Sequence, residues 1–297
     1  MIGVFDSGIG GLTVMRELLR EVPECGFVYL GDTARTPYGS KSPETVRRYA
    51  REDAQFLLDR GCQLIVVACN TASALAADDL RAAFPHVPIV EVVTPAVTAA
   101  VEATRTGRIG IIGTRATIAS GVYEREIARA STRAFPPPRS ERFSPCRRQG
   151  EREGVRAKHE GEREGVGSLT VHTRSCPLLV PLVEEGWLDV PETVSIIRTY
   201  LASLHATEVD TLILGCTHYP LLEPVIAQEM GEGVTIVNPA RAVASEVRKQ
   251  FERDALLASA CRGTSRAFHF TDTTPHTERL ASEWLGTPVR LELVEVP

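Results

Sequence analysis

The chain has 297 residues, an apolar content of 43% and a formal net charge of -5, which is enough for two packed domains. Charges of both signs are mixed without a basic stripe, so nucleic acid is excluded as the expected partner. No apolar run reaches membrane-spanning length and no basic leader precedes the first strand, so we expect a cytoplasmic protein, in which the thiols stay reduced. The seven cysteines lack zinc-ligand spacing, so we expect no metal site.

The first third of the chain alternates apolar strands with amphipathic helices, as in an α/β unit. The pattern predicts strands at 2–5, 27–30, 64–68 and 88–93, and helices at 12–22, 43–60 and 71–84. Ser42 is the expected N-cap of the second helix, with Pro43 at its first position. Thr94-Pro95 breaks the alternation, and we predict a domain boundary there.

From residue 109 the same alternation starts again, and the stretch 109–114 resembles 2–7, which indicates an internal pseudo-repeat. Strands are predicted at 109–114, 169–172, 212–214, 234–237 and 268–270, and helices at 116–130, 190–206, 221–230, 241–257 and 277–285. We therefore predict an α/β fold of two pseudo-symmetric domains with mainly parallel sheets flanked by helices and the active site in the cleft between them. The first domain is 1-93 plus 239-297 and the second is 94-238.

The stretch 136-166 does not fit this alternation. It begins with three prolines, carries the sequence Gly-Glu-Arg-Glu-Gly-Val twice, and lacks apolar periodicity. Such a segment cannot bury enough surface to offset the entropy of ordering it. We expect a flexible surface insertion.

Polar residues follow the first two predicted strands. The first strand runs into Asp6-Ser7-Gly8-Ile9-Gly10-Gly11, and the second is followed by Asp32. Glycines allow the backbone to approach a ligand closely, and the helix start beyond them offers free N–H groups to an anion. Each feature also has a plain interpretation, because tight turns contain glycines and both carboxylates are typical of turns or N-caps.

Two other strands end in a cysteine. Cys69 follows the strand at 64–68 and precedes Asn70 and Thr71, whereas Cys216 follows the strand at 212–214 and precedes Thr217 and His218. Ligands bind at the carboxyl ends of strands in open α/β sheets, and a thiol there can be ionised by nearby dipoles or an imidazole. The alternative is that both cysteines are small buried hydrophobes, as we expect for the other five.

Two thiols without a metal suggest a reaction that inverts the configuration at a carbon atom. A thiolate on one face of a substrate can remove a proton while a thiol on the other face delivers one. The site must also stabilise the developing charge with fixed donors, for which Asn70, Thr71 and Thr217 are suitable. Pyridoxal phosphate needs a Schiff-base lysine, and the chain has only three lysines, so we predict a mechanism without a cofactor.

The motifs resemble glutamate racemase of the aspartate/glutamate racemase family, in register along nearly the whole chain outside 136–166. They are Asp6-Ser7-Gly8-Ile9-Gly10-Gly11, Gly31-Asp32-Thr33 with Pro37-Tyr38-Gly39, Ala68-Cys69-Asn70-Thr71-Ala72, Cys176-Pro177-Leu178 through Glu184-Glu185-Gly186, and Leu214-Gly215-Cys216-Thr217-His218-Tyr219-Pro220. The resemblance implies interconversion of L- and D-glutamate by a two-base mechanism, which supplies D-glutamate for peptidoglycan in the cytoplasm. It also implies a homodimer.

The resemblance also implies residue roles. Cys69 is expected to serve the D-enantiomer and Cys216 the L-enantiomer. Asp6 and His218 are expected to assist these two thiols, and Asp32 and Glu184 to support them; Glu184 by itself reads as part of a solvated helix face. The expected substrate-binding residues are Asp6, Ser7, Tyr38, Gly39, Asn70, Thr71, Thr217 and His218, with Thr117 as a further candidate.

Two alternatives stay open. The same thiol pair would serve aspartate racemisation, although the residues around the two cysteines favour glutamate. The two-domain cleft could instead belong to a non-catalytic module that binds an amino acid.

Overall fold

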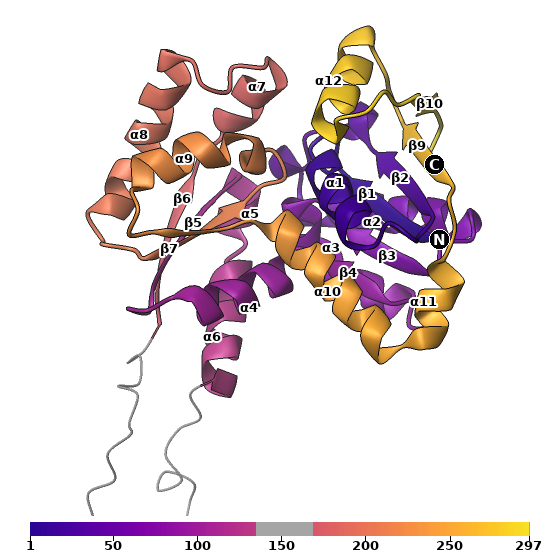
Figure 1. Cartoon of the computed structure of the whole chain (residues 1–297), viewed down its shortest axis with the longest axis horizontal. Coiled ribbons are helices and arrows are strands. Elements are labelled where there is room, and N and C mark those ends of the chain that lie inside the picture. The colour runs from indigo at the N-terminus through magenta and orange to yellow at the C-terminus, as the bar shows by residue number, and fades with distance from the viewer. Residues whose placement is uncertain (135–168, 297) are drawn as a thin grey trace, which may run out of the picture.

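The chain folds into two lobes, each built around its own parallel sheet (Figure 1). The structure is a computed structural model and describes residues 1–134 and 169–296. The fold class predicted from the sequence, α/β with parallel sheets flanked by helices, is confirmed. The predicted insertion at 136–166 lies outside the described residues.

The first lobe contains a six-stranded sheet in the order β10-β9-β2-β1-β3-β4, with every neighbouring pair parallel. Its strands are β1 (Ile2–Asp6), β2 (Phe27–Gly31), β3 (Leu64–Val67), β4 (Ile89–Glu91), β9 (Arg266–Phe270) and β10 (Glu292–Leu293). Its helices are α1 (Leu12–Glu21), η1 (Thr33–Arg35), η2 (Tyr38–Ser40), α2 (Pro43–Asp59), α3 (Asn70–Ala83), α10 (Pro239–Arg253), α11 (Ala255–Cys261) and α12 (Pro275–Leu285).

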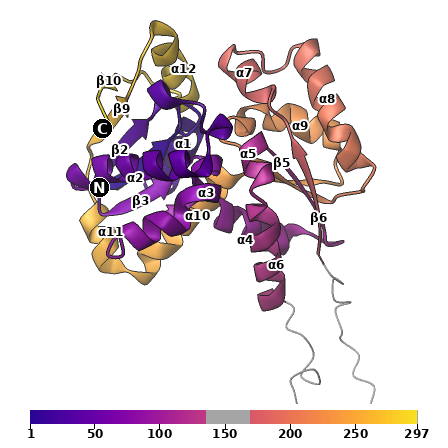
Figure 2. The ribbon, with the colours of Figure 1, turned by 180° about the vertical axis from the view of Figure 1, so that it is seen from behind.

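The second lobe contains a four-stranded parallel sheet in the order β6-β5-β7-β8. Its strands are β5 (Arg108–Gly113), β6 (Thr170–Ser175), β7 (Thr211–Gly215) and β8 (Thr235–Val237). Its helices are α4 (Val93–Ala103), α5 (Arg115–Ala119), α6 (Val122–Ala134), α7 (Leu179–Glu184), α8 (Pro191–His205), η4 (Tyr219–Leu222) and α9 (Glu223–Met230). Seen from behind, the two lobes stand side by side (Figure 2). Helix α10 packs against α1 of the first lobe and also contacts α4 of the second.

The two sheets have corresponding strand orders. In the first sheet β1 lies between β2 and β3 with β4 beyond, and in the second β5 lies between β6 and β7 with β8 beyond. Cys69 follows β3 and Cys216 follows β7, so the two cysteines occupy corresponding positions in the two sheets. This is the arrangement that the internal pseudo-repeat predicted.

Three local features differ from the sequence expectations. The pair Thr94-Pro95 does not end a regular element but lies in the first turn of α4, where proline is tolerated because first-turn N–H groups have no partner within the helix. The helix expected at 116–130 is two helices that meet near Gly121, whose φ of 63° is left-handed. The helix expected at 241–257 ends at Arg253, and the Asp254 side chain caps α11.

Helices cover both faces of each sheet with apolar side chains. One cluster packs α2 and α3 on the first sheet, a second packs α4 and α6 on the second sheet, and a third continues across both lobes. The chain crosses between the sheets after β4 and again after β8, and the boundaries at 93/94 and 238/239 stay predictions. Within the described ranges, no helix has the length and apolar character needed to cross a membrane.

Candidate active site

A cavity of about 390 Å³ lies where the carboxyl ends of strands from both sheets meet. This volume falls in the range of small-molecule sites. Both cysteines at strand ends contribute to the wall, together with side chains from both lobes. The lining residues are Ser7, Gly8, Thr36, Pro37, Tyr38, Gly39, Ser40, Cys69, Asn70, Thr71, Thr114, Arg115, Pro177, Val180, Pro181, Glu184, Cys216, Thr217 and His218.

Cys69 lies at the start of α3 with its side chain 5% exposed. The Sγ atom accepts a hydrogen bond from the Ala72 N–H at 3.4 Å and donates one to the Ser7 hydroxyl at 3.4 Å. Burial, and then the nearby Asp6 carboxylate, raise the pKa of the Cys69 thiol to about 12. Cys69 therefore carries its proton at neutral pH.

Asp6 lies behind Cys69 and does not line the cavity. Its Oδ2 accepts the Gly8 N–H at 3.0 Å, whereas Oδ1 is buried and has no hydrogen-bond partner among the described residues. Burial raises the pKa of this carboxyl, although the charge of His218 acts in the opposite direction. A carboxyl in this state can exchange a proton with a neighbouring group.

Cys216 lies beside an imidazole, whereas Cys69 lies near a carboxylate. Its Sγ is 3.9 Å from Nδ1 of His218, and Nε2 of His218 is 2.9 Å from Oε1 of Glu184. Burial alone lowers the pKa of the imidazole, but the contacts with Cys216 and Glu184 outweigh it and raise the pKa to about 10. His218 is therefore an imidazolium at neutral pH. A positive charge at this distance stabilises a thiolate at Cys216.

Contacts from the first lobe hold the Cys216 loop in place. The Thr13 hydroxyl donates to the Thr217 carbonyl oxygen at 2.8 Å, and Trp284 of α12 packs edge-on against the His218 ring at a centroid distance of 5.7 Å. Nε2 of His276 lies 3.0 Å from the Glu184 carbonyl oxygen. The position of the second thiol and its imidazole thus depends on both lobes.

The predicted substrate-binding residues Ser7, Tyr38, Gly39, Asn70, Thr71, Thr217 and His218 all line the cavity. Tyr123 donates to Oδ1 of Asn70 at 2.7 Å, which leaves the amide N–H groups as the donors that Asn70 can offer. Thr117 does not reach the wall, but its hydroxyl lies 3.3 Å from that of Thr71.

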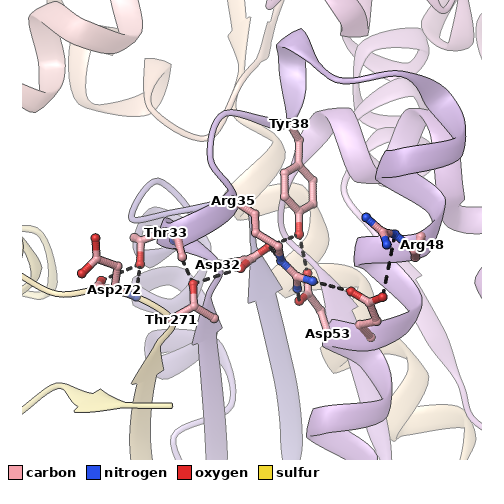
Figure 3. Close-up of polar contacts among 10 residues, drawn as sticks. Asp32, Thr33, Arg35, Tyr38, Arg48, Asp53, Thr271 and Asp272 are labelled. Atoms are coloured by element: carbon pink, nitrogen blue, oxygen red, sulfur yellow. Dashed lines mark hydrogen bonds and ion pairs between the residues drawn. The ribbon is translucent and has the colours of Figure 1, made fainter. Parts of the chain in front are cut away.

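Asp32 also lies outside the cavity wall and is fully buried. It contacts the Tyr38 hydroxyl, Nε of Arg35 at 2.6 Å and the Thr271 hydroxyl at 3.0 Å (Figure 3). Asp32 therefore meets the cavity only through Tyr38. Its expected support for the thiols stays a prediction.

Sequence reasoning missed a set of wall residues in the second lobe. Thr114 follows β5 as Ser7 follows β1, and its hydroxyl lies 3.2 Å from that of Thr71. Arg115, next along the chain, is an exposed cation in the wall. The resemblance of 109–114 to 2–7 was the signal that could have identified Thr114. Pro177, Val180 and Pro181 also line the cavity; they belong to the motif that runs from Cys176 to Gly186, to which the sequence assigned no binding residue before Glu184.

Gly10 is a point of close approach between the lobes. A Cβ atom at this position would lie 2.2 Å from Oγ1 of Thr217 and 2.6 Å from Cε1 of His218. Both distances are shorter than any normal contact, so a side chain at residue 10 must displace the Thr217–His218 segment.

We expect Gly10→Ala to lower turnover by roughly 10²-fold, because a shift of about 1 Å in catalytic groups has an effect of that size. The measurement is the steady-state rate together with the thermal unfolding midpoint. Gly233→Ala is the control, because a Cβ at residue 233 meets nothing within 4 Å. Full activity in Gly10→Ala would show that the Thr217–His218 segment can move without consequence.

The described residues contain no cluster of three or more histidine, cysteine, aspartate or glutamate side chains arranged to hold a metal ion. None of the cavity-lining residues is a lysine. The wall offers two thiols, the Glu184 carboxylate and the His218 imidazole for acid–base chemistry, with hydroxyl and amide groups as hydrogen-bond donors.

Comparisons with known proteins give the family. The family model for Asp/Glu/Hydantoin racemase matches residues 2–162. A glutamate racemase from Geobacter metallireducens is 40% identical over 96% of this chain and 92% of its own length. A crystal structure of a glutamate racemase isoform from Bacillus anthracis superposes with a TM-score of 0.83 at 34% identity, covering 100% of this chain and 98% of that one. A crystal structure of glutamate racemase from Francisella tularensis in complex with D-glutamate superposes with a TM-score of 0.81 at 29% identity, covering 99% of this chain and 97% of that one. The chain therefore belongs to the Asp/Glu/hydantoin racemase family and is an amino-acid racemase, which is an isomerase.

Proposed function

We propose that the chain interconverts L- and D-glutamate by moving the α-proton between two thiols, without a cofactor. The observation that carries the proposal is that Cys69 and Cys216 line one cavity from corresponding strand ends of two different sheets. A substrate between them presents opposite faces of its α-carbon to the two sulfur atoms. Two relatives that cover nearly the whole chain are glutamate racemases, one of them solved with D-glutamate, which supports glutamate as the substrate.

The two thiols lie in different electrostatic surroundings. The imidazolium of His218 favours a thiolate at Cys216, whereas burial and Asp6 keep Cys69 protonated. In the L to D direction, Cys216 removes the α-proton and Cys69 delivers its own proton to the opposite face. The enzyme then holds a thiol at Cys216 and a thiolate at Cys69, and a proton must return through solvent before the next turnover in the same direction.

The site must also stabilise the negative charge that develops on the substrate. The hydroxyls of Ser7, Thr71 and Thr217 and the amide of Asn70 are fixed donors around the cavity. Ser7 follows β1 and Thr217 follows β7, so donors reach the substrate from both lobes. Closure of the lobes around the substrate would exclude water and strengthen each of these contacts.

We further propose that the product supplies D-glutamate for peptidoglycan, that the enzyme works in the cytoplasm, and that it forms a homodimer. These proposals rest on the family resemblance. Size-exclusion chromatography with light scattering tests the dimer directly, and a monomer at all concentrations would contradict it.

We expect racemisation of glutamate to exceed that of aspartate by at least about 10²-fold in kcat/KM, because a shorter side chain leaves polar groups in the wall without partners. The measurement is circular dichroism of each amino acid with purified enzyme and no added cofactor. Equal rates for the two amino acids would favour a broader racemase. Binding of glutamate without any change in optical rotation would favour a non-catalytic module.

A further inference from the structure

A buried polar network lies directly behind the cavity wall. Asp53 on α2 is fully buried and faces the loop that carries Tyr38 (Figure 3). The Tyr38 hydroxyl contacts Oδ2 of Asp53 at 2.7 Å and Oδ2 of Asp32 on its other side. Arg35 joins the same two carboxyl groups, with Nη2 2.8 Å from Oδ1 of Asp53.

The number of protons in this network is fixed by its geometry. Two hydrogen bonds link the Tyr38 oxygen to two carboxyl groups, but a phenol carries one proton. The second proton must therefore belong to Asp32 or Asp53, because two oxygen atoms 2.7 Å apart without a proton between them repel each other.

Asp32 is the less suitable site for the extra proton, because it faces more donors than Asp53 does. Its two oxygens already face three donors, which are Nε of Arg35, the Thr271 hydroxyl and the Tyr38 hydroxyl. An ionised carboxylate is an acceptor only and suits three donors. Among the described residues, Oδ2 of Asp53 faces Tyr38 and Oδ1 faces Nη2 of Arg35. The proton therefore lies on Oδ2 of Asp53, which donates to the Tyr38 oxygen while Tyr38 donates to Asp32.

The charges around the network agree with this assignment. Arg35 and Arg48 each pair with Glu52, and Arg35 also pairs with Asp32. Arg35 also pairs with Asp53, so this one guanidinium faces three carboxyl groups, and a neutral Asp53 lowers the repulsion among them. Burial, and then the charge of Asp32, raise the pKa of Asp53 well above its usual range.

We propose that Asp53 is a positioning residue that, as a neutral carboxylic acid, donates a hydrogen bond to Tyr38 and thereby holds the 37–40 loop against the substrate. This inference rests on the proposed function, because the loop supplies the cavity wall at Pro37, Tyr38, Gly39 and Ser40. Asp53 itself does not line the cavity and acts through Tyr38.

The test compares two substitutions of similar size. Asp53→Asn keeps the pattern, because the amide N–H can donate to Tyr38 and the amide oxygen can accept from Arg35. Asp53→Leu removes the contacts that Asp53 makes with Tyr38 and with Arg35. We expect Asp53→Leu to raise the KM for glutamate by about tenfold or more with a smaller change in kcat, and Asp53→Asn to restore KM to within about threefold of the wild type.

A spectroscopic measurement decides the protonation state even if Asp53→Leu does not fold. The infrared difference spectrum of wild type minus Asp53→Asn at neutral pH is expected to show the C=O band of one protonated carboxyl group, shifted in D2O. A difference band of an ionised carboxylate would overturn the proposal, as would a KM in Asp53→Asn as high as in Asp53→Leu. The infrared result does not depend on the substrate, so failure of the proposed function would appear separately, as a wild type that does not racemise glutamate.

Discussion

Cys69→Ser and Cys216→Ser are each expected to lower the racemisation of glutamate by about 10³-fold or more while the protein remains folded. A serine hydroxyl is a far weaker acid than a thiol, so it neither ionises to remove the α-proton nor delivers one efficiently. The two lobes hold the thiols at corresponding strand ends, and neither can replace the other because they face the substrate from different sheets. Both single variants should therefore be nearly inactive.

The measurement is racemisation by circular dichroism, combined with transfer of solvent deuterium to Cα in D2O. For the wild type, deuterium should enter the product as it forms and be absent from the remaining substrate, because a different group delivers the proton. Cys62→Ala is the control, since Cys62 is buried in the α2–α3 core of the first lobe and does not line the cavity. Unchanged turnover in both serine variants would eliminate the two-thiol mechanism.

His218→Asn is expected to lower kcat by roughly 10²-fold, because an amide cannot carry the positive charge that stabilises the Cys216 thiolate. L- and D-glutamate have the same free energy in water, so kcat/KM must fall equally in both directions. Rates alone cannot reveal which face of the substrate His218 serves. The isotope effect can, because the substitution slows only the proton transfer that involves Cys216.

With the α-hydrogen replaced by deuterium, His218→Asn should show a larger primary isotope effect for L-glutamate than the wild type. For D-glutamate the effect should be smaller than in the wild type, because the slowed transfer from Cys216 then follows the cleavage of the C–D bond. Asp6→Asn is the matched variant on the Cys69 side. In that variant, the primary isotope effect should be larger than in the wild type for D-glutamate. The same enhancement for both enantiomers in both variants would contradict the separate assignment of Asp6 to Cys69 and His218 to Cys216.

The pH dependence gives a further check on His218. Its pKa is raised from 6.5 to about 10, so the imidazolium is present throughout the neutral range and is lost as the pH rises through about 10. Wild-type activity should therefore fall on the alkaline side as this proton leaves. His218→Asn has no such proton, so that alkaline limb should disappear from its profile.

The sequence determined the class of the fold and the position of both cysteines. Apolar runs of four or five residues that end in polar loops predict parallel strands with their ligand side at the carboxyl end, and the strands at β1, β2, β3, β5 and β7 begin and end within about two residues of the expected positions. The sequence also predicted the start of α2, with Ser42 as the N-cap and Pro43 at the first position, because such signals act within a few residues. The motifs then pointed to the family through their order along the chain.

Only the tertiary structure decided which polar residues face the cavity. Asp6 and Asp32 lie at the ends of strands as Cys69 does, yet both are buried and neither lines the cavity. Asp53 carried no signal, since one carboxylate within an amphipathic helix is indistinguishable from a solvated one until Tyr38 and Arg35 pack against it. The electrostatic surroundings of the two thiols have the same origin. Burial, and charges brought from distant segments such as Glu184 beside His218, are properties of the packed chain rather than of local sequence.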